Sequence, residues 1–222
     1  PGVIGKWFLA EIARWQGDYE TALALGNEAL AQAMPVEEMM PWLVVLVLGS
    51  HGSTYLQISE QFRDEIVKFH HRALALLESP AAVMTAGSTW AELGFCAMAL
   101  GDFPLAKEMF EKGFNFPTMF MRVEQPRLLA GSALVALEKG SLDQALKLAE
   151  EALAYAQERA MQHMMPITNN ALGKVLAAQG RHAEAIEAFA EAETAAVSMG
   201  MRPDAWKAML AAAGAFEEIG NY

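Results

Sequence analysis

Apolar and polar residues along the chain show almost none of the every-second-residue alternation that marks a half-buried β-strand. Only LVVLVL, residues 43–48, is ambiguous, because a short apolar run can be a buried strand or a buried helix. This run leads into GSHGSTY, residues 49–55, which places His51 among hydroxyl side chains, as in a catalytic turn. The pattern elsewhere predicts an all-α chain of about ten or eleven helices.

Turn signals recur at a nearly fixed interval. They are GDY at Gly17, GDF at Gly101, GSL at Gly140, GRH at Gly180 and GNY at Gly220, separated by 84, 39, 40 and 40 residues, so the first interval is about two periods. Small residues recur at fixed offsets from these turns. Before the turn stand Ala10, Gly94, Ala133, Gly173 and Ala213, and after it stand Ala22, Ala106, Ala145 and Ala185, then Ala29, Gly113, Ala152 and Ala192. These three columns predict helix pairs that cross too closely for large side chains.

The stretch WAELGFCAMALGDFPLAKEMF, residues 90–110, resembles a tetratricopeptide repeat, with Trp90, Leu93, Gly94, Ala106 and Phe110 at signature positions. The resemblance implies a tetratricopeptide-like α-solenoid: a right-handed superhelix of antiparallel helix pairs whose concave face is lined by the first helix of each pair. The period near 40 residues departs from the family's usual length of about 34. Longer units of this kind are similar to the helical sensor regions of large ATP-dependent bacterial transcription activators and of multidomain adenylate cyclases.

We expect one repeat domain over residues 1–222. Its units fall at about 1–35, 36–79, 80–117, 118–164 and 165–200, with a partial unit at 201–222. The chain begins without an initiator methionine, so we expect it to be part of a longer protein. The longest irregular connection is predicted at residues 114–126, where a hinge could lie, and it contains Phe114, Phe116 and Phe120.

The repeat phase resolves the ambiguous segment. Gly52 lies 42 residues from both Ala10 and Gly94, which places it in the small-residue column of a first helix. The apolar run is therefore predicted to be a buried helix that begins after Pro41, and the His51 segment is not a catalytic loop. Each first helix is expected to follow a proline: Pro41, Pro80, Pro126, Pro166 and Pro203.

Composition excludes several classes of function. With 16 Lys and Arg against 27 Asp and Glu, the net charge of -11 disfavours nucleic acid as a partner. The most apolar stretch, residues 39–48, is half the length of a membrane-spanning helix. The single cysteine fits a reducing compartment, so we expect a cytoplasmic protein.

No chemical motif stands out. His70 and His71 are adjacent and leave a helix about 100° apart, so we do not expect a metal site. Cys96 lies in an apolar helix and is predicted to be a buried thiol, while His163 and His182 are predicted to be structural or exposed. The chain has no phosphate loop, zinc motif or nucleophile elbow, so we expect neither a cofactor nor an enzyme.

The family's helical phase assigns positions to the concave face. The candidate partner-binding residues are Trp7, Glu11, Arg14, Phe95, Met98, Arg127, Leu134, Asn170 and Lys174. Only Asn170, Lys174 and Arg127 approach the clustered cations of a carboxylate clamp, which we do not favour for the whole groove. We expect a non-catalytic scaffold for a protein or peptide, forming the regulatory part of a larger bacterial signalling or transcription protein. Two alternatives remain open: a small-molecule effector sensor that controls an attached domain, and a homo-oligomer formed through exposed end units.

Overall fold

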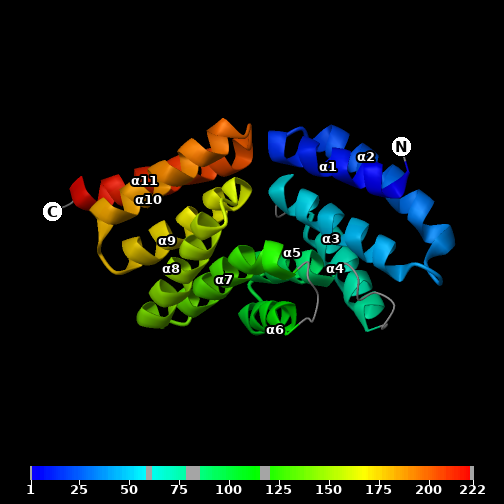
Figure 1. Cartoon of the computed structure of the whole chain (residues 1–222), viewed down its shortest axis with the longest axis horizontal. Coiled ribbons are helices and arrows are strands. Elements are labelled where there is room, and N and C mark those ends of the chain that lie inside the picture. The colour runs from blue at the N-terminus through cyan, green and yellow to red at the C-terminus, as the bar shows by residue number, and fades with distance from the viewer. Residues whose placement is uncertain (1, 59–61, 79–85, 116–120, 221–222) are drawn as a thin grey trace. The chain divides into compact units, whose positions relative to one another are not determined.

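The computed structural model describes residues 2–58, 62–78, 86–115 and 121–220, and its regular structure there is entirely helical (Figure 1). Its α-helices are α1 (Val3–Gln16), α2 (Tyr19–Ala33), α3 (Pro41–Ile58), α4 (Arg63–Leu77), α5 (Ala86–Ala99), α6 (Phe103–Phe114), α7 (Met121–Glu138), α8 (Leu142–Glu158), α9 (Met165–Ala178), α10 (His182–Ser198) and α11 (Arg202–Gly220). Two short 3-10 helices are η1 (Met34–Val36) and η4 (Gln162–Met164). The predicted all-α fold is confirmed.

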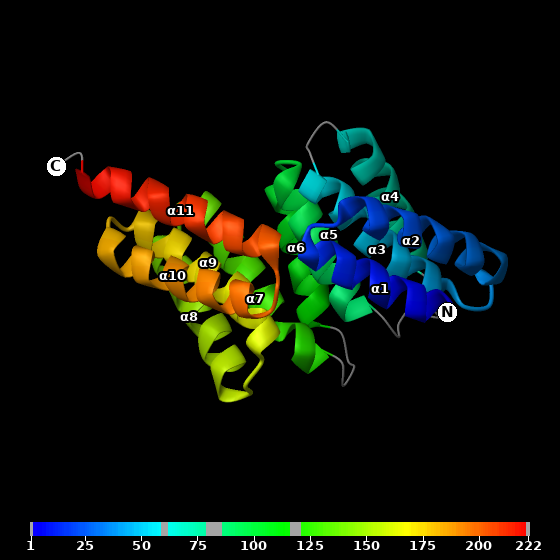
Figure 2. The same ribbon diagram turned by 90° about the horizontal axis from the view of Figure 1, so that it is seen from above.

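The helices form two compact units, Pro1–Met121 and Arg122–Tyr222, which we call the N-terminal and C-terminal units. The N-terminal unit contains the helix pairs α1/α2, α3/α4 and α5/α6, and the C-terminal unit contains α7/α8, α9/α10 and α11 (Figure 2). Their boundary lies within residues 114–126, the segment that contains the predicted hinge. A single repeat domain over the whole chain stays a prediction.

Four of the repeated glycines end first helices in the left-handed conformation. The φ angles are 78° at Gly17, 80° at Gly101, 72° at Gly140 and 75° at Gly180. Each turn has the same two backbone bonds; after α1 the N–H of Gly17 donates to the carbonyl of Arg14, and the N–H of Asp18 donates to that of Ala13. A side chain at such a φ is strained, which explains why glycine recurs there.

The aspartate after the glycine begins the second helix in two of these turns. Asp18 accepts a hydrogen bond from the backbone N–H of Thr21 at 3.1 Å, and Asp102 accepts one from that of Leu105 at 3.0 Å. The Gly-Asp pair therefore ends one helix and caps the next. The bond from Thr21 also lowers the pKa of the Asp18 carboxyl.

The small-residue columns mark close helix contacts, as predicted. A Cβ at Gly94 would lie 2.3 Å from the Phe110 ring of α6, and a Cβ at Gly173 would lie 2.5 Å from the Phe189 ring of α10. Each phenylalanine stands 16 residues after its glycine. At Ala133 the residue 16 positions later is Ala149, and both belong to one buried cluster. Ala213 is the exception: it is exposed, because no second helix follows α11 in the described chain.

The ambiguous apolar run is confirmed as a buried helix. Residues 43–54 of α3 are buried, and Leu43, Val44 and Leu48 pack in a core cluster with Trp90 and Leu93 of α5. His51 is 2 % exposed, and its ring lies against Gly26 and Phe69. Burial lowers the pKa of His51 to about 4, so this imidazole is neutral at physiological pH.

Two predictions of helix ends are wrong. Helix α7 begins at Met121 instead of after Pro126, so this proline lies inside the helix. Proline has no N–H to donate, but helix ends lack partners for their first N–H groups in any case, and position six is near enough to the start to be tolerated. Gly220 is helical in α11 and opens no turn within the described residues. Pro80, Phe116 and Phe120 lie outside the described residues.

Candidate binding surface

The candidate surface consists of one register of positions on the first helix of each pair. In the N-terminal unit these positions come from α1 and α5, and in the C-terminal unit from α7 and α9. The two units treat them differently. Glu11 and Arg14 are buried, Lys174 is exposed, and the others are half-buried: Trp7, Phe95, Met98, Arg127, Leu134 and Asn170.

A buried ionic network occupies the register in the N-terminal unit. The guanidinium of Arg14 forms an ion pair with the carboxylate of Glu11 on the same helix, with Nε 3.2 Å from Oε1. Its Nη2 also lies 3.6 Å from a carboxylate oxygen of Glu92 in α5. The hydroxyl of Ser50 in α3 donates to Glu11, and the hydroxyl of Ser53 donates to Glu92. The network therefore links α1, α3 and α5.

Burial of this network argues against direct contact between Glu11 or Arg14 and a partner. Their exposed fractions are 8 % and 6 %. Two carboxylates share one guanidinium, and a charge in such a place is tolerated only while paired and hydrogen-bonded. We assign both residues to holding consecutive first helices together.

The remaining candidates of the N-terminal unit present aromatic and thioether groups. The Trp7 ring meets Phe8 edge-on at 4.6 Å between centroids, and the Phe95 ring meets Phe110 at 5.3 Å. Half-buried rings of this kind offer apolar contact but no charge.

The C-terminal unit presents polar groups at the same register. Asn170 and Lys174 lie one helical turn apart on α9. Lys174 has an exposed surface, yet the protein atoms around its stem displace water and lower the pKa of its ammonium group. Lys207 of α11 lowers this pKa further, and Glu138 of α7 opposes the shift. The two lysines are therefore close enough for their charges to interact.

Lys207 was missed by the sequence analysis. It lies 80 residues after Arg127, so the two occupy the same register position two units apart. Arg127 forms an ion pair with Glu124 at 3.4 Å within α7. Extending the register into the last helix would have identified Lys207 before the structure was known.

The residues with reactive side chains form no obvious site. Cys96 is buried, as expected, and its sulfur lies 3.8 Å from the hydroxyl of Ser53. His70 is buried with a pKa lowered to about 4 by burial, its neighbour His71 is exposed, and their ring centroids are 6.3 Å apart. His163 is exposed and His182 is half-buried. Across the described ranges, no three His, Cys, Asp or Glu side chains are grouped to hold a metal ion.

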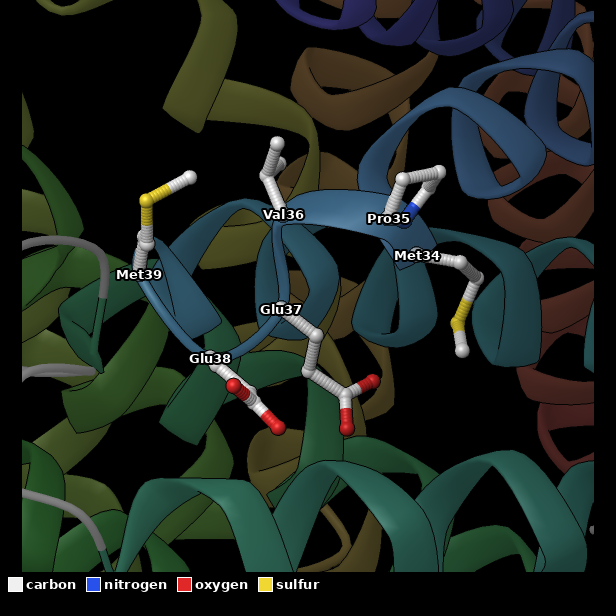
Figure 3. Close-up of a pocket in the computed structure, with 6 residues that line it drawn as sticks. All are labelled: Met34, Pro35, Val36, Glu37, Glu38 and Met39. Carbon is white, nitrogen blue, oxygen red and sulfur yellow. The ribbon is translucent and has the colours of Figure 1, made fainter.

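Two shallow hollows lie in the N-terminal unit. One of about 380 Å³ is lined by six consecutive residues: Met34, Pro35, Val36, Glu37, Glu38 and Met39. Figure 3 shows the carboxylates of Glu37 and Glu38 pointing away from the side chains of Val36 and Met39. Arg72 donates to Glu37 at 2.8 Å. A small-molecule site usually has polar groups converging from several elements, and this turn does not provide them.

The second hollow, of about 370 Å³, lies between the first turn of α1 and the start of α3. Its walls are backbone and apolar side chains, including Ile4 and Trp42. Within the described helices, none is both long and apolar enough to cross a membrane.

Comparison with known proteins supports the repeat assignment. A family model described as tetratricopeptide repeat matches residues 131–199 and 170–222. The tetratricopeptide repeat family is supported for this chain. Both matches fall in the C-terminal part, where the 40-residue tetratricopeptide units are most regular. A search of curated proteins gave no match.

Solved structures with tetratricopeptide-like repeats share the fold. Two structures of a Podosopora anserina protein described as a kinesin light chain with nearly identical TPR-like repeats, one of them a single-substitution variant, are each 19 % identical to this chain. The variant covers 87 % of this chain and 93 % of its own with a TM-score of 0.55, and the other covers 87 % and 94 % with a TM-score of 0.54. A more distant match is the TPR2AB-domain:pHSP90 complex of yeast Sti1, at 13 % identity, 94 % and 86 % coverage and a TM-score of 0.40. The fold class is therefore a tetratricopeptide-like α-solenoid.

Proposed function

We propose that the chain is a non-catalytic recognition scaffold that binds an acidic protein segment across the first helices of its C-terminal unit. The observation that supports this is the group formed by Asn170, Lys174 and Lys207, in which two ammonium groups interact beside an amide. Exposed ammonium and amide donors bind carboxylates by charge-assisted hydrogen bonds.

Neighbouring side chains suit a peptide more than an isolated anion. Leu134 of α7 is half-buried and packs on a cluster that includes Ala171 of α9, one position beyond Asn170. An extended partner could therefore place an apolar side chain near Leu134 and a carboxylate near Lys174. In the N-terminal unit, the carboxylates and guanidinium at this register are buried with one another, which leaves the C-terminal unit as the favoured site.

We place this scaffold in the regulatory part of a larger cytoplasmic bacterial signalling or transcription protein. The support for this context is the resemblance of the 40-residue units to sensor regions of bacterial activators and adenylate cyclases. Binding at the C-terminal unit would then report the presence of a partner to an attached domain.

The proposal is tested by fluorescence anisotropy with labelled peptides that end in an acidic run and a free carboxylate. Replacing either lysine, Lys174→Ala or Lys207→Ala, should weaken binding by about tenfold or more, because each removes a charged donor. The control Lys147→Ala makes the same charge change on α8, at an exposed position of a second helix, and should have no effect. Equal weakening by all three variants would show that net charge alone attracts the peptides and would refute the site.

A further inference from the structure

The outer face of α1 is apolar and exposed. Ile4, Phe8, Leu9 and Ile12 lie along one side of this helix, and Phe8 is 56 % exposed. Terminal units of repeat proteins normally present a polar outer face, because an apolar face at the end of an array is left in water. Something other than solvent is therefore expected to cover α1.

The repeat register shows which kind of surface α1 presents. Positions equivalent to Phe8 and Ile12 are Ser50 and Thr54 in α3, Glu92 and Cys96 in α5, and Ala171 and Val175 in α9, and all six are buried. In each later helix these positions face the preceding first helix: Ser50 bonds to Glu11 of α1, and Ala171 packs in a cluster with Leu129 and Ala130 of α7. The face of α1 is thus built to receive a preceding first helix.

The outer face of α11 is the complementary surface. Leu176 of α9 is buried in a cluster with Ala215 of α11. The residue of α11 equivalent to Leu176 is Phe216, which is 59 % exposed, because no further first helix covers it. Gly214 lies beside it, exposed, and a Cβ added there would meet no atom within 4 Å.

The joints between consecutive first helices follow a rule of size. Each pairs a long side chain on one helix with a small one on the next, in either order. Glu11 bonds to Ser50, Ser53 bonds to Glu92, and Leu134 packs on the cluster that contains Ala171. The equivalent positions between α9 and α11 are Lys174 and Ala211, again long and small. One small partner in each pair lets two helix backbones approach while the long side chain fills the space between them.

The two unpaired positions at the ends of the chain obey the same rule with each other. The free position on α11 is Gly214, the smallest residue, and the free position on α1 is Phe8. We propose that α1 of a second copy of this chain docks on α11, with Phe8 seated over Gly214 and Phe216 against the second copy's Leu9 and Ile12. The joint would continue the stacking of first helices from one molecule into the next.

Such a contact joins two different surfaces, so it is head-to-tail and leaves one free face at each end of the assembly. Association of this type is open: it adds further copies as concentration rises, whereas a two-fold contact stops at the dimer. The proposal therefore predicts the form of the association as well as its existence.

Sedimentation velocity of the 222-residue chain, from micromolar to near-millimolar concentration, tests the proposal. The average mass should rise continuously through dimer and trimer. Phe8→Ala and Gly214→Leu should each weaken association by about tenfold or more, the first by removing the buried ring and the second by filling its seat. Phe8 and Gly214 are exposed, so neither change should harm folding, which far-UV circular dichroism checks. Val197→Ala, at an exposed apolar position on α10, is the matched control and should have no effect.

The double variant Phe8→Ala/Gly214→Leu is the decisive test. It exchanges the sizes of the two partners and reproduces the Leu134 and Ala171 joint inside the chain, so association should recover to near the original strength. A monomer at every concentration would overturn the proposal and leave a helix of another protein as the occupant of these faces. A closed dimer, equal weakening by Val197→Ala, or failure of the double variant to recover would also overturn it.

Discussion

The glycines of the small-residue column should respond in opposite ways to the same substitution. Gly52 and Gly94 occupy one register position on α3 and α5 of the N-terminal unit. A Cβ at Gly52 would meet the Cβ of Phe69 at 3.6 Å, an ordinary contact. A Cβ at Gly94 would lie 2.3, 2.6 and 2.7 Å from three ring carbons of Phe110, which is fully buried and packed on Phe95. That ring cannot move without repacking the core.

These distances give the expected magnitudes. Gly52→Ala gains the helix preference of alanine and should raise the free energy of unfolding by about 1 kcal/mol. Gly94→Ala gains the same preference but overpacks the core, which costs about 1–3 kcal/mol. Because three contacts would be far inside van der Waals range, we take the upper end, and the net effect is a loss of about 2 kcal/mol.

Chemical denaturation followed by circular dichroism measures both variants in the same unit. Adding Phe110→Ala to Gly94→Ala should cost less than the sum of the two single changes, because the new methyl group enters the space vacated by the ring. The reasoning would be refuted if Gly94→Ala stabilised the chain as much as Gly52→Ala, or if the two changes at Gly94 and Phe110 proved additive.

Two further predictions concern buried charge in the N-terminal unit. Burial lowers the pKa of His51 from 6.5 to about 4, so its contribution to stability is complete above pH 6.5 and is lost as the pH falls toward 4; it is at most about 3 kcal/mol, and His51→Leu should remove this part of the decline in a pH series of unfolding curves. Arg14→Met leaves the carboxylates of Glu11 and Glu92 without this cation and should lower the free energy of unfolding by about 3–5 kcal/mol, whereas the triple variant Glu11→Leu/Arg14→Met/Glu92→Leu should cost much less in the same denaturation assay. A larger loss in the triple variant than in Arg14→Met would contradict the second prediction.

The sequence predicted the fold because its strongest constraint is local and repeated. Helix pairs that cross closely need small residues at fixed distances from a turn, and Gly94 and Gly173 show that the space beside each is filled by a phenylalanine 16 residues later. The turn needs a residue that adopts positive φ, which glycine does without strain. Both requirements leave marks in one dimension, so His51 could be assigned to a buried helix although its neighbours resemble a loop.

The contacts between pairs were harder to predict, because they depend on which neighbour covers a position. The register places Glu11 and Arg14 on the partner-facing side of α1, but it does not reveal that Ser50 and Glu92 from the next two first helices close over them. Lys207 illustrates the converse: it was available from the period alone and was omitted because the last unit was treated as incomplete. The start of α7 depends on context that Pro126 by itself does not provide.

One register therefore has different consequences in the two units, and the difference follows from side-chain chemistry. Where the position after the small column carries Glu11 or Ser53, the next helix answers with a hydroxyl or a carboxylate, and the pair is buried as a structural link. Where it carries Lys174, the next helix answers with Ala211, which offers no partner for an ammonium group, and the charge stays at the surface. Recognition by the C-terminal unit thus depends on a joint in which the small partner is apolar, and replacing Ala211 by an acidic residue would turn a binding position into another internal link.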